Sequence, residues 1–447
     1  MIVILHGWSD DYKSFKSLGK FLADQGLSDV TDLHLGNYIS MDDDVTYDDI
    51  IAAMEKAWKK RGLPNDPRSV DVIVHSTGGL VIRDWMTRFR TPENNPIRRL
   101  LFLAPANFGS PLAHKGNAFI GRITKGFTGK KLFQTGRHIL EGLELGSEYS
   151  WQLAWNDVFS DKAWYGPGKV LATVLVGNDG YSGIAAIANE SGTDGTVRVS
   201  TANLNAEYFH WDFATDPSSP VHTSQLATAP TAFARLNDEN HGTITMNGGH
   251  CANQRTADMM LRALQVEDGD FNQYCLDLQE FSENERQLTK QMSFDDRKFR
   301  AGYQNTVIHL SDDTGHDVED YVIEFFAKKS GSNKPDNLLT ALIQQKVITT
   351  VHPYGNNKSY RSILIDTDEL QTLMVERNRD LFISLTALPE LSRNGNVGYS
   401  TLAYNDIGSI HIEASRIPVL IQPDRTLLID IVIKRQQGPK VFEFKSV

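Results

Sequence analysis

The feature that most constrains the fold is a short apolar strand that leads directly into a serine and two glycines. Residues 70–75 read Val-Asp-Val-Ile-Val-His, and Ser76-Thr77-Gly78-Gly79 follow. A serine between a buried strand and a helix, here predicted over residues 78–88, is the setting of a nucleophile elbow. The motif usually has glycine two positions before the serine, where this chain has Val74. The alternative, a serine that only caps an ordinary helix, does not account for the strand–turn–helix order.

Residues 1–267 alternate short apolar strands with amphipathic helices. Strands are predicted at 2–5, 70–74, 100–104 and 170–176, and helices at 14–25, 47–60, 78–88 and 257–264. This order predicts a parallel sheet covered by helices on both faces, and with the elbow it predicts an α/β-hydrolase domain of the α/β class. The alternation breaks over residues 111–165, which we interpret as an insertion or lid.

The pattern changes after residue 267. Residues 268–300 are charged and are predicted to form a helical connector. Over residues 301–447, short β-type runs alternate with polar turn clusters such as Ser330-Gly331-Ser332-Asn333. This pattern predicts a mainly antiparallel, sandwich-like C-terminal domain rich in β structure.

Charge and cysteine content argue against several protein classes. The chain has 45 basic and 56 acidic residues, a net charge of −11, which disfavours a nucleic-acid-binding protein. Cys251 and Cys275 lack CxxC spacing, and the sequence carries no metal or cofactor signature. The apolar run at residues 2–5 is too short for a secretory signal and is interpreted as a strand. No run approaches the roughly 20 apolar residues of a membrane helix, so any membrane contact is expected to be peripheral.

The acid of a catalytic triad should follow a later strand, in the chain order Ser, Asp, His. Asp194 lies in Gly192-Thr193-Asp194-Gly195-Thr196-Val197, and Asp179 lies in Gly177-Asn178-Asp179-Gly180. We favour Asp194, because Asp-Gly-Thr-Val resembles the acid loop of many lipases. Asp179 is interpreted as a turn residue. The acid would accept the imidazole N–H and stabilise the imidazolium.

Four histidines have the right chain position for the base: His210, His222, His241 and His250. We favour His241, because Asn240-His241-Gly242-Thr243-Ile244 resembles the histidine loop of lipases. His250 is the main alternative. His210 lies in an aromatic run and is expected to be a packed residue, while His222 follows Pro220 in a polar loop.

Acyl transfer needs two backbone N–H donors aimed at the developing oxyanion. Thr77, directly after the nucleophile, is predicted to supply one. Trp8, in His6-Gly7-Trp8 after the first strand, is predicted to supply the other. The alternative is that Gly7 only makes a tight turn there. His6 and His75 are expected to have structural hydrogen-bonding roles.

Two charged stretches are candidates for a binding role. Residues 111–140 contain six basic residues and no Asp or Glu, and they either lie against anionic lipid head groups or form a solvated face. An acidic cluster suggests calcium but lacks the spacing of a known calcium loop, so a solvated loop is the preferred interpretation. Its members are Asp312, Asp313, Asp317, Glu319 and Asp320.

In combination, His-Ser-Thr-Gly-Gly, His-Gly near residue 6, Asp-Gly-Thr-Val and Asn-His-Gly-Thr-Ile resemble the bacterial cell-associated phospholipase A (PlaB-like) family. The family usually has Thr where Val74 stands. The resemblance spans essentially the whole chain, with the motifs in the first 250 residues. It implies phospholipase A and lysophospholipase activity, cell-associated peripheral membrane binding and homo-oligomers. It also implies the triad Ser76, Asp194 and His241.

The predicted reaction is hydrolysis of fatty-acyl esters of phospholipids through an acyl-enzyme. His241 would take the proton of Ser76, and the N–H groups of Trp8 and Thr77 would hold the oxyanion. One alternative is a soluble carboxylesterase or thioesterase. Another is a catalytically inactive hydrolase scaffold that binds a lipid or a protein partner.

Overall fold

The chain forms two compact units, seen here in a computed structural model. The structure describes residues 1–5, 15–27, 29–33, 43–113, 136–182, 186, 189–216, 220–246, 253–390, 397–399, 402 and 410–437. Unit 1 comprises Met1–Ala206 and Leu226–Ala301, and unit 2 comprises Glu207–Gln225 and Gly302–Val447. No helix in these ranges is both long enough and apolar enough to span a bilayer.

Unit 1 is built on a six-stranded parallel sheet in the order β2-β1-β3-β4-β5-β8. Its strands are β1 (Ile2–Leu5), β2 (Val30–Leu33), β3 (Val70–His75), β4 (Ile97–Leu103), β5 (Leu171–Gly177) and β8 (Ala232–Leu236). The central strands β1, β3, β4 and β5 are buried along most of their length, which explains their largely apolar sequences. The α/β class and the buried strand at residues 2–5 are confirmed.

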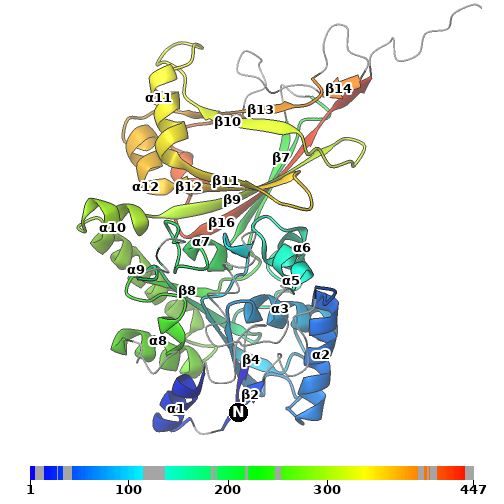
Figure 1. The fold of residues 1–447 in the computed structure, drawn as a ribbon, viewed down its shortest axis with the longest axis vertical. Helices are drawn as coiled ribbons and strands as arrows, with labels where there is room; N and C mark the ends of the chain where they lie inside the picture. The colour runs from blue at the N-terminus through cyan, green and yellow to red at the C-terminus, as the bar shows by residue number, and fades with distance from the viewer. Residues whose placement is uncertain are drawn as a thin grey trace, which may run out of the picture. The chain divides into compact units, whose positions relative to one another are not determined.

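Helices cover both faces of this sheet (Figure 1). The helices described in unit 1 are α1 (Lys16–Asp24), α2 (Tyr47–Lys60), α3 (Gly78–Phe89), α5 (Arg137–Leu143), α6 (Glu148–Asn156), α7 (Val199–Ala202), α8 (Gln254–Gln265), α9 (Phe271–Thr289) and α10 (Phe294–Phe299). Side chains of α1, α8 and α9 share one apolar core with the strands. On α2 and α3, Trp58 packs against Trp85 with ring centroids 4.7 Å apart.

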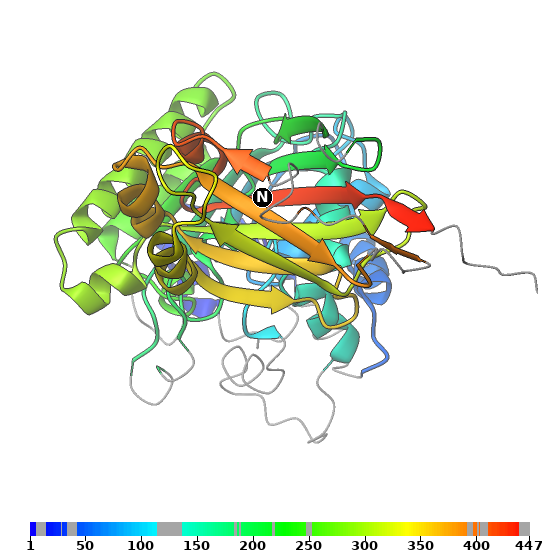
Figure 2. The same ribbon diagram turned by 90° about the horizontal axis from the view of Figure 1, so that it is seen from above.

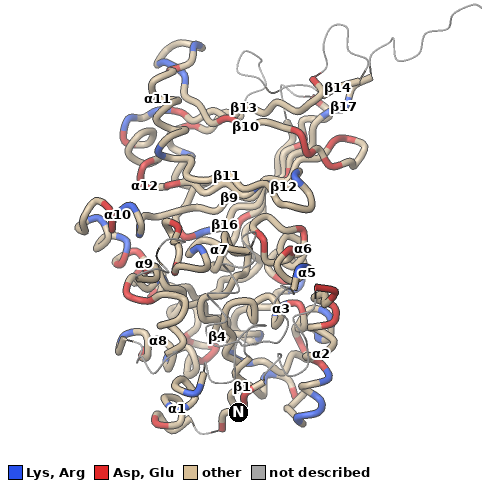
Figure 3. Tube along the Cα trace, viewed as in Figure 1, with Lys and Arg blue, Asp and Glu red and all other residues tan. Residues whose placement is uncertain are grey.

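Helix α2 shows how local sequence sets an element's ends. Thr46 and Asp49 form a capping box, in which each side chain accepts from the other's backbone N–H. Acidic residues occupy the first turn and basic residues the last turn, which complements the helix dipole. Figure 3 shows this separation of charge along α2, beside central strands that carry few charged residues.

Unit 2 contains a six-stranded mixed sheet, a three-stranded antiparallel sheet and a two-stranded ribbon. The first sheet has the order β11 (Ile348–Pro353), β12 (Tyr360–Asp366), β9 (Tyr303–Asp312), β16 (Arg425–Ile433), β6 (Glu207–Asp212), β7 (Val221–Leu226). The second has the order β10 (Tyr321–Phe326), β13 (Leu381–Ala387), β15 (Ile410–Ile412), and β14 (Val397–Tyr399) pairs with β17 (Arg435–Gln437). Helices α11 (Asn337–Leu342) and α12 (Thr367–Leu370) lie at one end of the strands (Figures 1 and 2), and α13 spans Ile417–Leu420. Two short π-helical turns, Ile343–Val347 and Gln371–Val375, extend α11 and α12.

The division into units differs from the expected boundaries in two places. Residues 207–225, which were expected in the first domain, belong to unit 2, where they form β6 and most of β7. On β6, the side chain of Phe209 lies in the core of unit 2 and that of Trp211 packs against it. Helix α9, expected in a connector, packs Phe271, Tyr274 and Leu278 into the core of unit 1. The β-rich second unit is confirmed, and its larger sheet is mixed because β16 runs parallel to both β9 and β6.

Candidate active site

Ser76 occupies a strained turn between β3 and α3. Its φ of +53° is unusual for a residue with a Cβ, and its side chain is buried. Backbone hydrogen bonds hold this conformation: the Ser76 N–H donates to Leu103 O at 3.2 Å, and the N–H of Ala106 donates to Ser76 O at 3.3 Å. The turn therefore has the strand–turn–helix geometry expected of a nucleophile elbow.

Gly79 allows α3 to approach the loop that follows β4. A Cβ at this position would lie 2.9 Å from the Cβ of Pro105 and 3.1 Å from Oδ1 of Asn107. Because real Cβ atoms do not approach this closely, a larger residue would push the helix away from the loop. The second glycine of the motif is thus required by close packing one turn beyond Ser76.

His241 links the serine to a buried carboxylate. Its Nε2 lies 3.1 Å from Oγ of Ser76, and its Nδ1 lies 2.8 Å from Oδ2 of Asp194. The backbone N–H of His241 also donates to Asp194 O at 3.0 Å. Oδ1 of Asn240 accepts from the N–H groups of Gly242 and Thr243, which shapes the loop that carries the imidazole.

Asp194 is completely buried and fully hydrogen-bonded. Its Oδ1 accepts from the N–H groups of Thr196 at 2.9 Å and Val197 at 2.7 Å, while Oδ2 faces His241. With Oδ2 as acceptor, Nδ1 of His241 carries the proton and Nε2 is left to accept from the Ser76 hydroxyl. This arrangement can remove a proton from the serine and stabilise the resulting imidazolium.

The structure thus brings together Ser76, Asp194 and His241. Thr77 is the N-cap residue of α3 and is buried beside Ser76. Trp8, His6 and His250 lie outside the described residues, as does most of the basic stretch at 111–140. Within that stretch, Arg137 is described and forms an exposed ion pair with Glu141.

The other candidates that the structure describes, which are the alternative acid and base residues and the acidic cluster, are not part of the Ser76–His241–Asp194 hydrogen-bond chain. Asp179 forms an ion pair with Arg300 at 2.6 Å and accepts from the N–H of Gly180. His210 is on β6 in unit 2, 3.0 Å from Asp430, and His222 is exposed on β7. In the acidic cluster, Oδ1 of Asp312 accepts from the N–H groups of Thr314 and His316, and so shapes a turn.

His75 contacts the loop that carries His241. The sequence predicts a structural hydrogen-bonding role for His75 but does not identify its partner. Its Nε2 lies 3.1 Å from the carbonyl oxygen of His241, and the two ring centroids are 4.5 Å apart. Because a carbonyl only accepts, Nε2 of His75 carries the proton. Phe15 packs edge-on against the same ring, so His75 is held from two sides.

A buried ion pair supports the elements around the site and has no sequence signal. Arg83, on α3, donates through Nε and one terminal nitrogen to the Asp157 carboxylate at 2.7 and 2.8 Å. Burial disfavours the charged guanidinium, but Asp157 outweighs burial and raises the pKa of Arg83. Arg83 also donates to Asn107 O at 3.0 Å, and the Asn107 amide donates to Ala202 O at 2.7 Å. Helix α3, which follows Ser76, is therefore connected to the segment that follows Asp194.

Among solved structures, phospholipase PlaB from Legionella pneumophila is similar over essentially its whole length. The TM-score is 0.80 at 24% sequence identity, and the match covers 100% of this chain and 96% of that chain. The chain has the PlaB fold. The structure of phospholipase PlaB in complex with thio-NAD matches with the same coverage and identity at a TM-score of 0.79. No family model and no curated protein sequence matches the chain.

The PlaB fold accounts for both units in one chain. A match to a lipase from Bacillus licheniformis, BlEst2 in its mature form, covers 59% of this chain and 91% of that chain, at 15% identity and a TM-score of 0.36. The PlaB match extends over the β-rich unit as well as the hydrolase unit.

Proposed function

We propose that the protein is a serine hydrolase that cleaves fatty-acyl esters of glycerophospholipids and lysophospholipids. The observation that carries the proposal is the unbroken hydrogen-bond chain from Ser76 through His241 to Asp194. All three side chains are buried, so these bonds are shielded from water, and the serine is held in the strained turn that presents a nucleophile.

In the proposed reaction, Nε2 of His241 removes the Ser76 hydroxyl proton as Oγ attacks the ester carbonyl carbon. Asp194 stabilises the imidazolium. The N–H groups of Thr77 and Trp8 are proposed to hold the oxyanion of the tetrahedral intermediate. The imidazolium then protonates the departing lysolipid alkoxide. Water, deprotonated by His241, finally releases the fatty acid from the acyl-enzyme.

The phospholipid substrate is the finer part of the proposal. It is supported by the motif resemblance and by the similarity to phospholipase PlaB along the whole chain. Peripheral binding to a bacterial membrane and assembly into homo-oligomers belong to the same proposal. Flotation with anionic vesicles and light scattering after gel filtration test these two properties separately from catalysis.

The decisive experiment pairs covalent labelling with lipid hydrolysis. A fluorophosphonate probe should label the wild-type chain and not Ser76→Ala, and only the wild type should release fatty acid from phosphatidylcholine vesicles. Retained lipid hydrolysis in a folded Ser76→Ala variant would contradict the proposal. Labelling with cleavage of soluble esters but not of vesicle lipid would instead identify a soluble esterase.

A further inference from the structure

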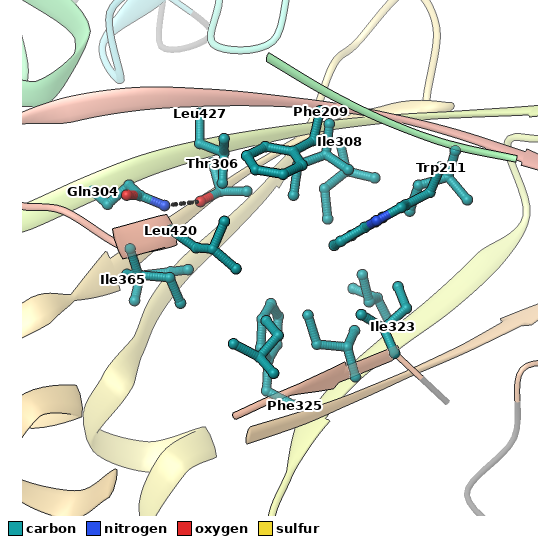
Figure 4. Close-up of a pocket in the computed structure, with 16 residues that line it drawn as sticks. Phe209, Trp211, Gln304, Thr306, Ile308, Ile323, Phe325, Ile365, Leu420 and Leu427 are labelled. Atoms are coloured by element: carbon teal, nitrogen blue, oxygen red, sulfur yellow. Dashed lines mark hydrogen bonds between the residues drawn. The ribbon is translucent and has the colours of Figure 1, made fainter. Parts of the chain in front are cut away.

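A narrow apolar cavity lies inside unit 2, between its two larger sheets. Figure 4 shows Phe209 on one side, Phe325 on the other and open space between them. The cavity has an empty volume of about 500 Å³, a value that includes open solvent, and about 30 Å³ of the space admits the centre of a water molecule. The space is therefore a slot. Protein cores are normally close-packed, so a slot of this kind in a sandwich of branched side chains calls for an explanation.

The two polar side chains that line the slot are both hydrogen-bonded within the protein. Of the 16 residues that line it, all but Gln304 and Thr306 are apolar. The Gln304 amide donates to Thr306 Oγ1 at 3.0 Å, and its oxygen accepts from the N–H of Gln422 at 2.6 Å. Because these polar groups already have hydrogen-bond partners, water inside the slot would find few hydrogen bonds, and hydrocarbon is the occupant that matches the lining.

The slot has an opening that an apolar chain can use. Trp211 and Ile323 line it from opposite layers, on β6 and β10, and both are only partly buried, unlike Phe209 and Phe325 beside them. Leu420 also lines the space and is partly buried, and we infer that the mouth lies between Trp211 and Ile323. An occupant could place hydrocarbon between the sheets and keep a polar head outside, beside the indole of Trp211.

We propose that this slot binds one unbranched fatty-acyl chain. Its narrowness excludes branched or multi-ring ligands, and its dry lining excludes a charged head group. The site belongs to unit 2 and goes beyond the proposed hydrolysis in unit 1. Free fatty acid and lysophospholipid share the chain chemistry, so either can be the source.

The test uses the full-length Ser76→Ala chain and 9,10-dibromostearate, whose bromines quench a tryptophan only near contact. The chain has seven tryptophans, so the contribution of Trp211 is isolated by comparison with a Trp211→Phe variant in the same background. We expect saturable quenching whose main component disappears in Trp211→Phe.

A matched pair of mouth variants identifies the binding place. Ile323→Trp should fill the opening and raise the Kd for the brominated acid at least tenfold. Val322→Trp is the control, because Val322 is the adjacent residue of β10, is 59% exposed and points to the opposite face. It should leave the Kd within about twofold.

Stearoyl lysophosphatidylcholine, used as a competitor, distinguishes the sources. Displacement shows that the slot accepts a lysolipid tail, and no displacement restricts it to the free acid; both outcomes support a chain site. Absence of the Trp211-dependent quenching, or equal Kd values in Ile323→Trp and Val322→Trp, would overturn the proposal. If Ile323→Trp does not fold, the Trp211→Phe comparison decides alone. None of these readouts depends on Ser76 catalysis, so failure here leaves the proposed hydrolysis standing.

Discussion

The ring of His75 donates a hydrogen bond from Nε2 to the main-chain carbonyl of His241, at 3.1 Å. The residue before Ser76 thereby holds the loop that carries His241. The contact keeps the His241 ring in position to accept from Ser76, and both histidines are buried.

Replacement of His75 should therefore lower turnover more than substrate binding. His75→Phe keeps a ring but loses the donor, and we expect kcat to fall about 10- to 100-fold with KM nearly unchanged. His75→Gln keeps an N–H donor at a similar reach and should recover part of the loss. Steady-state kinetics of both variants, with thermal unfolding as a control, test this. A kcat in His75→Phe equal to that of the wild type would remove the positioning role.

Asp194→Asn should abolish most activity while preserving the fold. The N–H groups of Thr196 and Val197 would attract the amide oxygen, which leaves the NH₂ group facing Nδ1 of His241. The imidazole would then carry its proton on Nε2 and could not accept from Ser76. We expect kcat to fall about 10³- to 10⁴-fold, as for triad aspartates in general. Asp179→Asn, which loses only a partly exposed ion pair with Arg300, should stay within about twofold.

Gly79→Ala should destabilise the protein because its new methyl group would meet Pro105 and Asn107. Overpacking of this kind costs about 1–3 kcal/mol. Gly19, inside α1, is the matched control: nothing lies within 4 Å of its added Cβ. Gly19→Ala should be neutral or stabilise by up to about 1 kcal/mol. Chemical denaturation of both variants measures the difference, and equal free energies of unfolding would refute the close approach.

Asp366 should make the protein less stable as the pH rises. Burial raises the pKa of this carboxyl from 3.8 to about 7, although its oxygen accepts from the N–H groups of Asp368 and Glu369. Between these values the folded state binds more protons than the unfolded state. The free energy of unfolding should therefore fall from about pH 4 to pH 7 and level off above, by at most about 4 kcal/mol.

Asp366→Asn provides the check on this pH dependence. An asparagine oxygen can still accept from the same two N–H groups, but it cannot ionise. The variant should match the wild type near pH 4 and exceed it at pH 8 in denaturant titrations. If the wild type retains its low-pH stability at pH 8, Asp366 does not ionise at a cost, and the expectation fails.

Local pattern was enough to predict that Ser76, Asp194 and His241 come together, because an elbow, an acid loop and a histidine loop follow one another in chain order. The Arg83–Asp157 pair had no such signal, since its partners lie 74 residues apart and neither belongs to a recurring motif. Likewise, the sequence predicts only a packed aromatic run at residues 208–211, and local pattern does not say that it forms a strand or which sheet it joins. Its pairing partner, β16, lies far along the chain.

The pairing of β6 with β16 also affects how the chain folds during its synthesis and after truncation. His210 pairs with Asp430 across 220 residues, so a ribosome completes β6 long before its neighbour exists. The edge of β6 that β16 covers must stay open while the rest of unit 1 is made, and an open edge invites pairing with other chains. Removal of the residues after 301 would leave that edge open permanently. A fragment cut there would therefore be prone to aggregate, however complete its parallel sheet.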